Sequence, residues 1–313
     1  MPRVLISGVS GFVGRHLASA LAARGDACHG FGLGDPPADP PLAGWRAGDM
    51  LDADAVAAAV AASRPDAVVH LAGQSSAALS FEQPVETYRA NALGTWTLLD
   101  AVRRHARDAR VLIVGSGEAY GPQPDGSRVA EEAPFRPVSP YALSKAAADS
   151  LSDAFAKRHG LKVIRTRSFG HTGPGQSPTF AVPSFARQIA AIEAGDGEAV
   201  LRVGNLEVTR DLTDVRDVVK AYVALLERGR PGAAYNVCRG EGVRLTDLVQ
   251  RMVARARRPI RIEVDPARVR PADLPYLVGD PTAIARDTGW RAATPLDATL
   301  DAALEDWRGR ARR

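Results

Sequence analysis

A chain of 313 residues, of which 45% are hydrophobic and 24% charged, can bury a complete parallel sheet with helices on both faces. Its net charge of +4 comes mostly from arginine, and the basic runs at 255–261 and 308–313 are typical of solvated helix ends, so we expect no nucleic-acid partner. Cys28 and Cys238 form no CxxC pair, so we expect no metal. No apolar run reaches the length of a membrane span, and a strand-like run at Arg3 leaves no room for a leader. We therefore expect a cytoplasmic protein.

Strands and helices alternate along the first half of the chain. Continuous apolar runs predict strands at 3–7, 27–31, 67–71, 111–114 and 161–166. Between them we expect helices from the first turn to residue 23, at 52–62, over 81–105 as one long helix, and from Ser139, which can cap a helix that has Pro140 in its first turn. The alternation predicts an α/β fold with a doubly wound, parallel, Rossmann-type sheet.

The pattern of the sequence changes after Arg167, where a loop and shorter elements follow. We therefore expect a dinucleotide-binding domain over residues 1–167 and a smaller C-terminal substrate-binding lobe over 168–313. Part of 207–238 is expected to return to the first domain.

The first strand leads into a turn with the sequence GVSGFVG at 8–14. Glycines at this place let the backbone approach a pyrophosphate, and the amides at the start of the following helix favour the phosphate charge. The turn predicts a dinucleotide site made by Gly8, Ser10, Gly11, Phe12, Val13 and Gly14.

The end of the second strand carries no carboxylate, since the first one is Asp35, beyond Gly34. A carboxylate there would bind the 2′-hydroxyl of NAD and repel the 2′-phosphate of NADP. Its absence slightly favours NADP(H) over NAD(H).

Tyr141 and Lys145 lie four residues apart on the helix that begins near Ser139, so both face the same way. A lysine cation beside a tyrosine favours the phenolate and is expected to lower its pKa from about 10 toward neutrality. Ser116 follows an apolar strand at the sheet edge where ligands bind, and it can hydrogen-bond a substrate oxygen. These residues predict acid–base chemistry at a carbonyl.

The glycine turn and these three side chains resemble the extended short-chain dehydrogenase/reductases over nearly the whole chain, as do Asp49 in GDMLD, HLAG at 70–73 and Asn91 in NALGT. The resemblance implies that Tyr141 and Lys145 reach the nicotinamide ribose and that Asn91 supports the active-site helix. It also implies further cofactor contacts, near the adenine and along the dinucleotide, by Asp49, Met50, Leu71, Ala72 and Gly73.

The second half resembles the GDP-sugar branch of that family in RTRSFGHTGPGQSP, VPSFARQI, VGNLEVTRDLTDVRD, YNVCRG and RPADLPYLVGD. The resemblance implies NAD(P)H-dependent reduction of the C4 carbonyl of a GDP-4-keto-6-deoxyhexose. Tyr141 would supply the proton, and Lys145 would adjust the pKa of its phenol. Ser116 would orient the carbonyl, and Glu118 would contact the sugar. The implied nucleotide contacts are Arg187, the diphosphate clamp Arg210 and Arg270, and Asp273; forked guanidinium groups suit diphosphate oxygens.

Two features leave the substrate and the reaction open. Gly170 stands where the family usually has an asparagine that helps to hold the nucleotide-sugar, so the sugar and the nucleobase are not fixed. A 4,6-dehydratase or epimerase that retains NAD(P) is an alternative, with Glu118 taking the C5 proton, although Gly117 lacks the polar side chain that dehydratases carry. A non-catalytic sensor of NADP is a third hypothesis, which the intact Ser116, Tyr141 and Lys145 disfavour.

The sequence also gives expectations for two histidines and for two helices that could form a dimer. His70, on a buried strand, is expected to be structural, and His171, in the substrate loop, is more typical of a packing residue than of a ligand contact. By resemblance, the helices at 81–105 and 139–159 are expected to form a homodimer.

Overall fold

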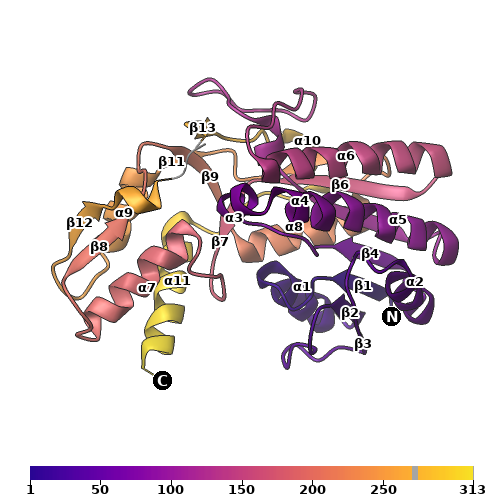
Figure 1. The fold of residues 1–313 in the computed structure, drawn as a ribbon, viewed down its shortest axis with the longest axis horizontal. Coiled ribbons are helices and arrows are strands. Elements are labelled where there is room, and N and C mark those ends of the chain that lie inside the picture. The colour runs from indigo at the N-terminus through magenta and orange to yellow at the C-terminus, as the bar shows by residue number, and fades with distance from the viewer. Residues whose placement is uncertain (270–273, 313) are drawn as a thin grey trace.

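The computed structural model describes residues 1–269 and 274–312, and a seven-stranded sheet dominates it (Figure 1). The strand order is β10-β6-β5-β4-β1-β2-β3, and every neighbouring pair is parallel. The predicted doubly wound parallel sheet is confirmed. Its strands are β1 (Arg3–Ser7), β2 (Ala27–Gly32), β3 (Gly44–Ala47), β4 (Ala67–His70), β5 (Arg110–Ser116), β6 (Lys162–Ser168) and β10 (Ala234–Val237).

Helices cover both faces of this sheet because successive strand residues point to opposite sides. Val4 and Ile6 of β1 belong to one buried cluster, and Leu5 between them belongs to the other. The first cluster is closed by α1 (Phe12–Ala23), α8 (Val215–Arg228) and α10 (Thr282–Thr288), and the second by α2 (Ala53–Ser63), α5 (Gly94–His105) and α6 (Pro140–His159).

The expectation of one helix over 81–105 is wrong. The segment contains α3 (Ala77–Glu82), α4 (Pro84–Tyr88), a π-helix (Arg89–Leu93) and then α5. Proline has no amide hydrogen and restricts the residue before it, so α3 ends ahead of Gln83, whose backbone (φ −130°, ψ 62°) is not helical. Pro84 then occupies the first turn of α4, where no amide is needed.

A smaller lobe lies beside the sheet, at the left of Figure 1. It contains a sheet ordered β11-β9-β13 with β7 paired to β9, and a two-stranded sheet of β8 and β12. Its core lies between α7, α9 and α11, while α8 and β10 return to the larger sheet. The remaining bounds are β7 (Gly170–Thr172), β8 (Val200–Val203), β9 (Thr209–Asp214), β11 (Gly242–Arg244), β12 (Arg261–Val264), β13 (Tyr276–Leu277), α7 (Ala181–Glu193), α9 (Leu245–Val253), α11 (Leu296–Ala311) and short 3₁₀ turns at Gly117–Tyr120 and Pro266–Arg268.

Within the described residues, no helix combines the length and the apolar character needed to cross a membrane.

Candidate active site

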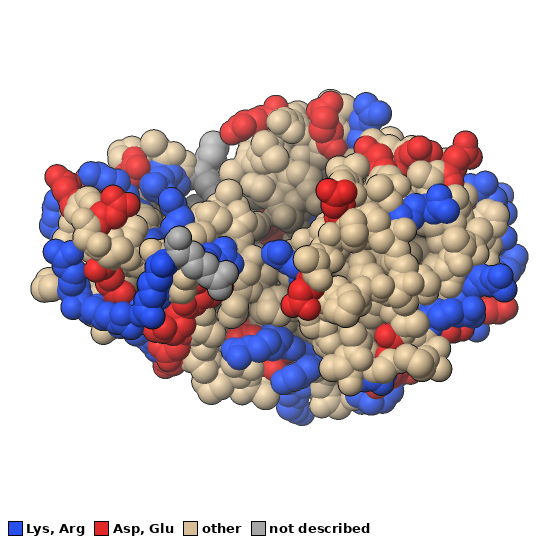
Figure 2. Space-filling model, turned by 90° about the horizontal axis from the view of Figure 1, so that it is seen from below, with Lys and Arg blue, Asp and Glu red and all other residues tan. Residues whose placement is uncertain are grey.

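A cavity of about 910 Å³ lies between the two lobes and is lined from both. The molecule is visibly hollowed there in Figure 2. On the side of the large sheet it is lined by the turn after β1, the end of β5 and the first turns of α6; on the other side it is lined by β7, α7 and β9. The cavity therefore opens at the carboxyl edge of the parallel strands, where such sheets bind ligands.

The glycine-rich turn forms one end of this cavity. Gly8 has a φ of +73°, and a Cβ atom on it would lie 2.7 Å from the amide nitrogen of Ala72. A Cβ atom on Gly14 would lie 2.6 Å from the Cα atom of Val9, so the helix passes the turn at a distance that only glycine permits. Helix α1 begins at Phe12 without a side-chain cap and without an acidic residue in its first turn. Its first amides are thus available to a pyrophosphate, and the turn fits a dinucleotide.

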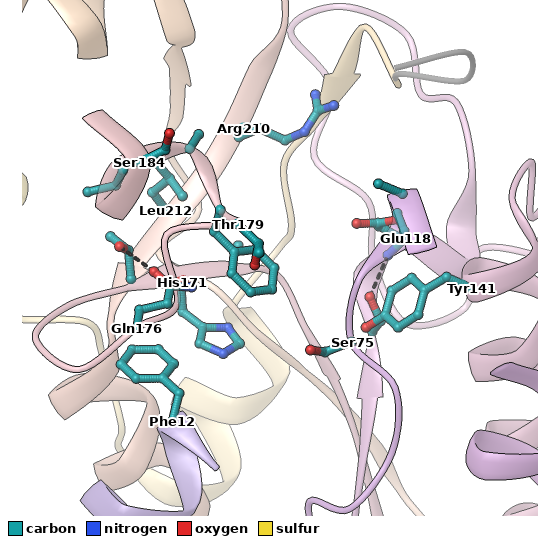
Figure 3. Close-up of a pocket in the computed structure, with 18 of the residues that line it drawn as sticks. Phe12, Ser75, Glu118, Tyr141, His171, Gln176, Thr179, Ser184, Arg210 and Leu212 are labelled. Atoms are coloured by element: carbon teal, nitrogen blue, oxygen red, sulfur yellow. Dashed lines mark hydrogen bonds between the residues drawn. The ribbon is translucent and has the colours of Figure 1, made fainter. Parts of the chain in front are cut away.

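Ser116 and Tyr141 both line the cavity, and Figure 3 shows Tyr141 beside Glu118 on this wall. Ser116 is the last residue of β5, Tyr141 lies in the first turn of α6, and each is 8% exposed. A hydrogen bond joins the two side chains, and Ser116 Oγ also accepts one from the Glu118 amide at 3.2 Å. Ser139 caps α6 by accepting from the Ala142 amide at 3.1 Å, which fixes the start of the helix that carries Tyr141.

The electrostatics of this pair differ from the sequence expectation. Burial raises the pKa of Tyr141, and the Glu118 carboxylate raises it further, while the hydrogen bond to Ser116 opposes both. Lys145 is not among the groups that lower it in this structure, and its Nζ atom donates to the carbonyl oxygen of Val114 at 3.1 Å. Burial lowers the pKa of Lys145 to about 8. Tyr141 is therefore held in its protonated form at neutral pH.

Asn91 connects α6 to the loop after β4 from inside the π-helix. Its Oδ1 atom accepts from the Gln74 amide at 2.9 Å, and its Nδ2 atom donates to the Gln74 carbonyl at 3.0 Å and to Ser144 Oγ at 2.8 Å. The side chain of Asn91 is buried, so bulk water does not compete for these hydrogen bonds. The implied supporting role of Asn91 agrees with these contacts.

His70 lies beneath the site and outside the cavity lining. It is 3% exposed and bonds to Ser7 Oγ at 2.7 Å and to Thr95 Oγ1 at 3.1 Å, joining β1, β4 and α5. Burial and the nearby Lys145 charge lower the pKa of His70 to about 3, so the ring is neutral. These contacts are those of a structural residue.

The predicted cofactor residues divide between the cavity and its surroundings. The cavity is lined by Gly8, Gly11, Phe12, Val13, Gly14, Leu71 and Gly73. Four others lie outside this lining: Ser10 and Asp49 are exposed, Met50 is buried in the core, and Ala72 packs against that core. The carboxylate of Asp49 accepts from the Leu51 amide at 2.9 Å.

The predicted substrate residues are also divided. Glu118 and Arg210 line the cavity, whereas Arg187 is exposed on α7 and outside the lining. Arg270 and Asp273 lie outside the described residues. Sequence reasoning missed several polar side chains that face the cavity, namely Ser75, Gln176, Thr179, Ser184, Arg202, Asn205 and Arg268. Several of them stand within the motifs quoted above, but a motif does not show which of its side chains faces the ligand.

Comparison with known proteins identifies the family of the chain. A family model described as GDP-mannose 4,6-dehydratase matches residues 5–302. The chain belongs to this family, within the extended short-chain dehydrogenase/reductases. It is 36% identical over 311 residues to the GDP-6-deoxy-D-mannose reductase of Pseudomonas aeruginosa, covering 99% of this chain and 98% of that one. The predicted family is confirmed.

Solved structures of other family members share the whole fold. The structure of RMD from Pseudomonas aeruginosa complexed with NADPH has a TM-score of 0.86 and 34% identity, covering 99% of this chain and 100% of that one. The UDP-glucose 4-epimerase of Thermus thermophilus, in complex with NAD, has a TM-score of 0.89 and 30% identity, covering 98% of this chain and 99% of that one. This extended reductase fold therefore spans the entire chain.

The structure leaves little room for a side chain at Gly170. β7 lies so close to β9 that a Cβ atom on Gly170 would be 2.7 Å from the carbonyl oxygen of Asp211 and 3.0 Å from Leu212 Cδ2. An asparagine at position 170 would therefore need the two strands to move apart. Polar contacts at this wall must come from neighbouring residues.

Proposed function

We propose that the protein reduces the C4 carbonyl of a GDP-linked 4-keto-6-deoxyhexose with NADPH. The observation that carries the proposal is the buried, hydrogen-bonded Ser116–Tyr141 pair, which lies on the cavity wall between a dinucleotide turn and an arginine-bearing lobe. The similarity to the GDP-6-deoxy-D-mannose reductase over the full length supports the same substrate class.

Bound NADPH would supply the hydride, and residues of the chain would bind and protonate the carbonyl oxygen of the substrate. Hydride addition turns the carbonyl oxygen into an alkoxide, which needs a proton from a positioned acid. The raised pKa of Tyr141 keeps that proton on the phenol until the alkoxide forms. The Ser116 hydroxyl, beside the Tyr141 phenol on the cavity wall, is placed to hold the carbonyl oxygen, and Lys145 lines the same wall.

The opposite lobe fits a nucleoside diphosphate. Arg202, Arg210 and Arg268 all line its side of the cavity. Their guanidinium groups carry permanent charge and form forked hydrogen bonds that suit phosphate oxygens. We assign the diphosphate to this wall, with the hexose between it and Tyr141.

NADPH is preferred to NADH in this proposal. β2 ends at Gly32 and is followed by Leu33, which is 70% exposed, so no carboxylate faces the ribose at that point to repel a 2′-phosphate. The solved structure of the Pseudomonas aeruginosa relative is complexed with NADPH. Since NADPH and nucleotide-sugars are cytoplasmic metabolites, we also place the protein in the cytoplasm.

A dehydratase remains the second candidate, because Glu118 approaches Tyr141 closely enough to raise the pKa of that phenol. A base at this place could take a sugar proton. However, a Cβ atom on Gly117 would lie 3.0 Å from the ring of Phe169, so the ring occupies the space that a polar side chain at 117 would need. We therefore favour net reduction.

The test is oxidation of NADPH by the purified protein with GDP-, UDP- and dTDP-4-keto-6-deoxyhexoses. We expect oxidation with the GDP-linked sugar and not with the other two. Tightly bound oxidised cofactor with no net consumption of NADPH would instead support the dehydratase or epimerase.

We also propose a homodimer through α4, α5 and α6 with the π-helix between the first two. Large apolar side chains on these elements are 42–61% exposed, namely Val85, Tyr88, Leu93, Trp96 and Leu143. A row of this kind favours contact with another apolar surface.

A further inference from the structure

The segment at 173–180 forms part of the cavity wall in the smaller lobe. It leaves β7 and leads into α7, and four of its residues line the cavity, namely Gln176, Pro178, Thr179 and Phe180. In Figure 3, Thr179 lies across the cavity from Tyr141 and Glu118. The position of this segment therefore sets the shape of the wall that faces the reacting groups.

The segment holds only part of its shape by itself. Gln176 is 6% exposed, accepts at Oε1 from Thr172 Oγ1 at 2.7 Å, and donates from Nε2 to the carbonyl oxygen of His171 at 3.1 Å. Ahead of it, Gly173 and Gly175 have φ angles of +157° and +89°. Because glycine has the widest choice of backbone conformations, this glycine turn needs contacts from outside to keep one position.

Both lobes supply such contacts. The Gly175 amide donates to Asp306 Oδ2 of α11 at 2.9 Å. From the larger lobe, His16 Nε2 of α1 bonds to the carbonyl oxygen of Pro174 at 2.9 Å. A carbonyl oxygen can only accept, so His16 donates this hydrogen bond from Nε2. His16 thus ties the segment to the helix that follows the dinucleotide turn.

Helix α1 has a second contact with the same wall. Phe12, its first residue, stacks on the ring of His171, with the ring centroids 6.2 Å apart and the planes within 7°. The other side of this contact is His16, whose ring meets Phe12 at 89° with the centroids 5.5 Å apart. The packing role expected of His171 agrees with these contacts. Phe12 and His16, one turn apart on α1, therefore join the cofactor helix to the substrate wall.

We infer that His16 is a positioning residue that couples the two ligand sites. Its hydrogen bond to Pro174 fixes the segment at 173–180 on α1, so a dinucleotide bound at the start of α1 also orders the wall for the nucleotide-sugar. His16 is absent from the described residues that line the cavity, so it acts through the segment and touches neither ligand. The inference deepens the proposed function and rests on it for the identity of the two ligands. Coupling of this kind strengthens the binding of each ligand by the same factor when the other is bound.

Two variants of His16 separate the hydrogen bond from packing. His16→Gln keeps an amide donor near the position of Nε2, whereas His16→Met has a similar length and no donor. Glutamine and methionine have similar helix propensities, so α1 itself is treated alike. His105→Met makes the same change at an exposed position on α5 and serves as the control.

Two measurements are made on each protein, with and without saturating NADPH. Hydrogen–deuterium exchange of the peptide at 172–182 is followed by mass spectrometry, and binding of GDP-mannose is measured by titration calorimetry. Binding of NADPH alone and thermal unfolding are recorded for each variant as well.

We expect NADPH to slow exchange in this peptide and to strengthen GDP-mannose binding in the wild type, in His16→Gln and in His105→Met. In His16→Met both effects should be lost. GDP-mannose should then bind about three- to tenfold more weakly in the presence of NADPH, as for one lost hydrogen bond. The affinity for NADPH alone and the unfolding temperature should stay close to those of the wild type.

Unchanged coupling in His16→Met, or no coupling in the wild type, would overturn the inference. Equal losses in His16→Met and His16→Gln, together with a lower unfolding temperature, would also overturn it, because they would show packing alone. The exchange measurement needs neither a sugar nor turnover. A wild-type protein in which NADPH orders the segment, but which oxidises no NADPH with the GDP-linked keto sugar, would therefore refute the proposed function and leave this inference standing.

Discussion

Tyr141 combines a buried phenol with a raised pKa and a hydrogen bond to Ser116. Tyr141→Phe removes the phenol that we propose protonates the alkoxide, while keeping the ring. We predict a kcat lower by about 10²–10⁴-fold in an NADPH oxidation assay, with NADPH binding retained. The same change at Tyr88, exposed on α4, should leave kcat unchanged; wild-type turnover by Tyr141→Phe would revive the non-catalytic sensor.

Glu118 gives a prediction about pH. Its negative charge raises the pKa of Tyr141, so Glu118→Gln should lower that pKa. Reduction needs the protonated phenol, and activity is lost as pH rises through its pKa. The alkaline limb of the kcat–pH profile should therefore move to lower pH in Glu118→Gln and stay in place in Glu118→Asp, which keeps the charge. A limb that is unmoved in Glu118→Gln would show that the two groups are not coupled.

At the scale of residues, the sequence predicted chemistry better than orientation. The three side chains of Ser116, Tyr141 and Lys145 line one cavity. This could be expected from the four-residue spacing of Tyr141 and Lys145 and from the position of Ser116 at a strand end. The expected effect of Lys145 on the pKa of Tyr141 was not found, and spacing does not show that burial lowers the pKa of Lys145 itself. Likewise, a motif does not reveal that Arg187 is exposed while Arg202 lines the cavity, because this depends on how the lobes pack.

At the scale of elements, the π-helix places Asn91 between α6 and the loop after β4. Asn91→Ala would leave the half-buried Gln74 backbone groups and the buried Ser144 hydroxyl without these partners. We predict a loss of about 1–3 kcal/mol in the free energy of unfolding, measured by urea denaturation. Thr97→Ala removes an exposed hydroxyl that donates to the Leu93 carbonyl one turn earlier, and it should cost less than about 0.5 kcal/mol. Equal losses in the two variants would contradict the assigned role.

The strands were predictable because a strand covered on both faces is a continuous apolar run. β1 agrees with the predicted 3–7, and β5 and β6 contain their predicted ranges with small extensions, apart from Leu161. The prediction of one helix over 81–105 is wrong because apolar and helix-forming residues continue through the segment, whereas Pro84 interrupts the helix. The π-helix at Arg89–Leu93 has no sequence signal comparable to a proline.

At the scale of the whole molecule, the exposed apolar row on α4, α5 and α6 predicts the mode of assembly. Trp96 is 51% exposed, and Trp96→Glu would place a charge in the proposed interface. We predict a wild-type dimer and a Trp96→Glu monomer by analytical ultracentrifugation. Val264→Glu, a similar change at a 55% exposed site in the smaller lobe, should remain dimeric. A wild-type monomer at micromolar concentration would refute the proposed dimer.

The proposed reaction is net hydride transfer from NADPH to C4 of a GDP-linked sugar. It is tested most directly by incubating the enzyme with GDP-4-keto-6-deoxymannose and NADPH deuterated at the transferable C4 position, and analysing the product by mass spectrometry and NMR. We predict one NADPH consumed per sugar and one deuterium at C4 of a GDP-6-deoxyhexose. Product without deuterium, or a sugar converted with no NADPH consumed, would contradict the account.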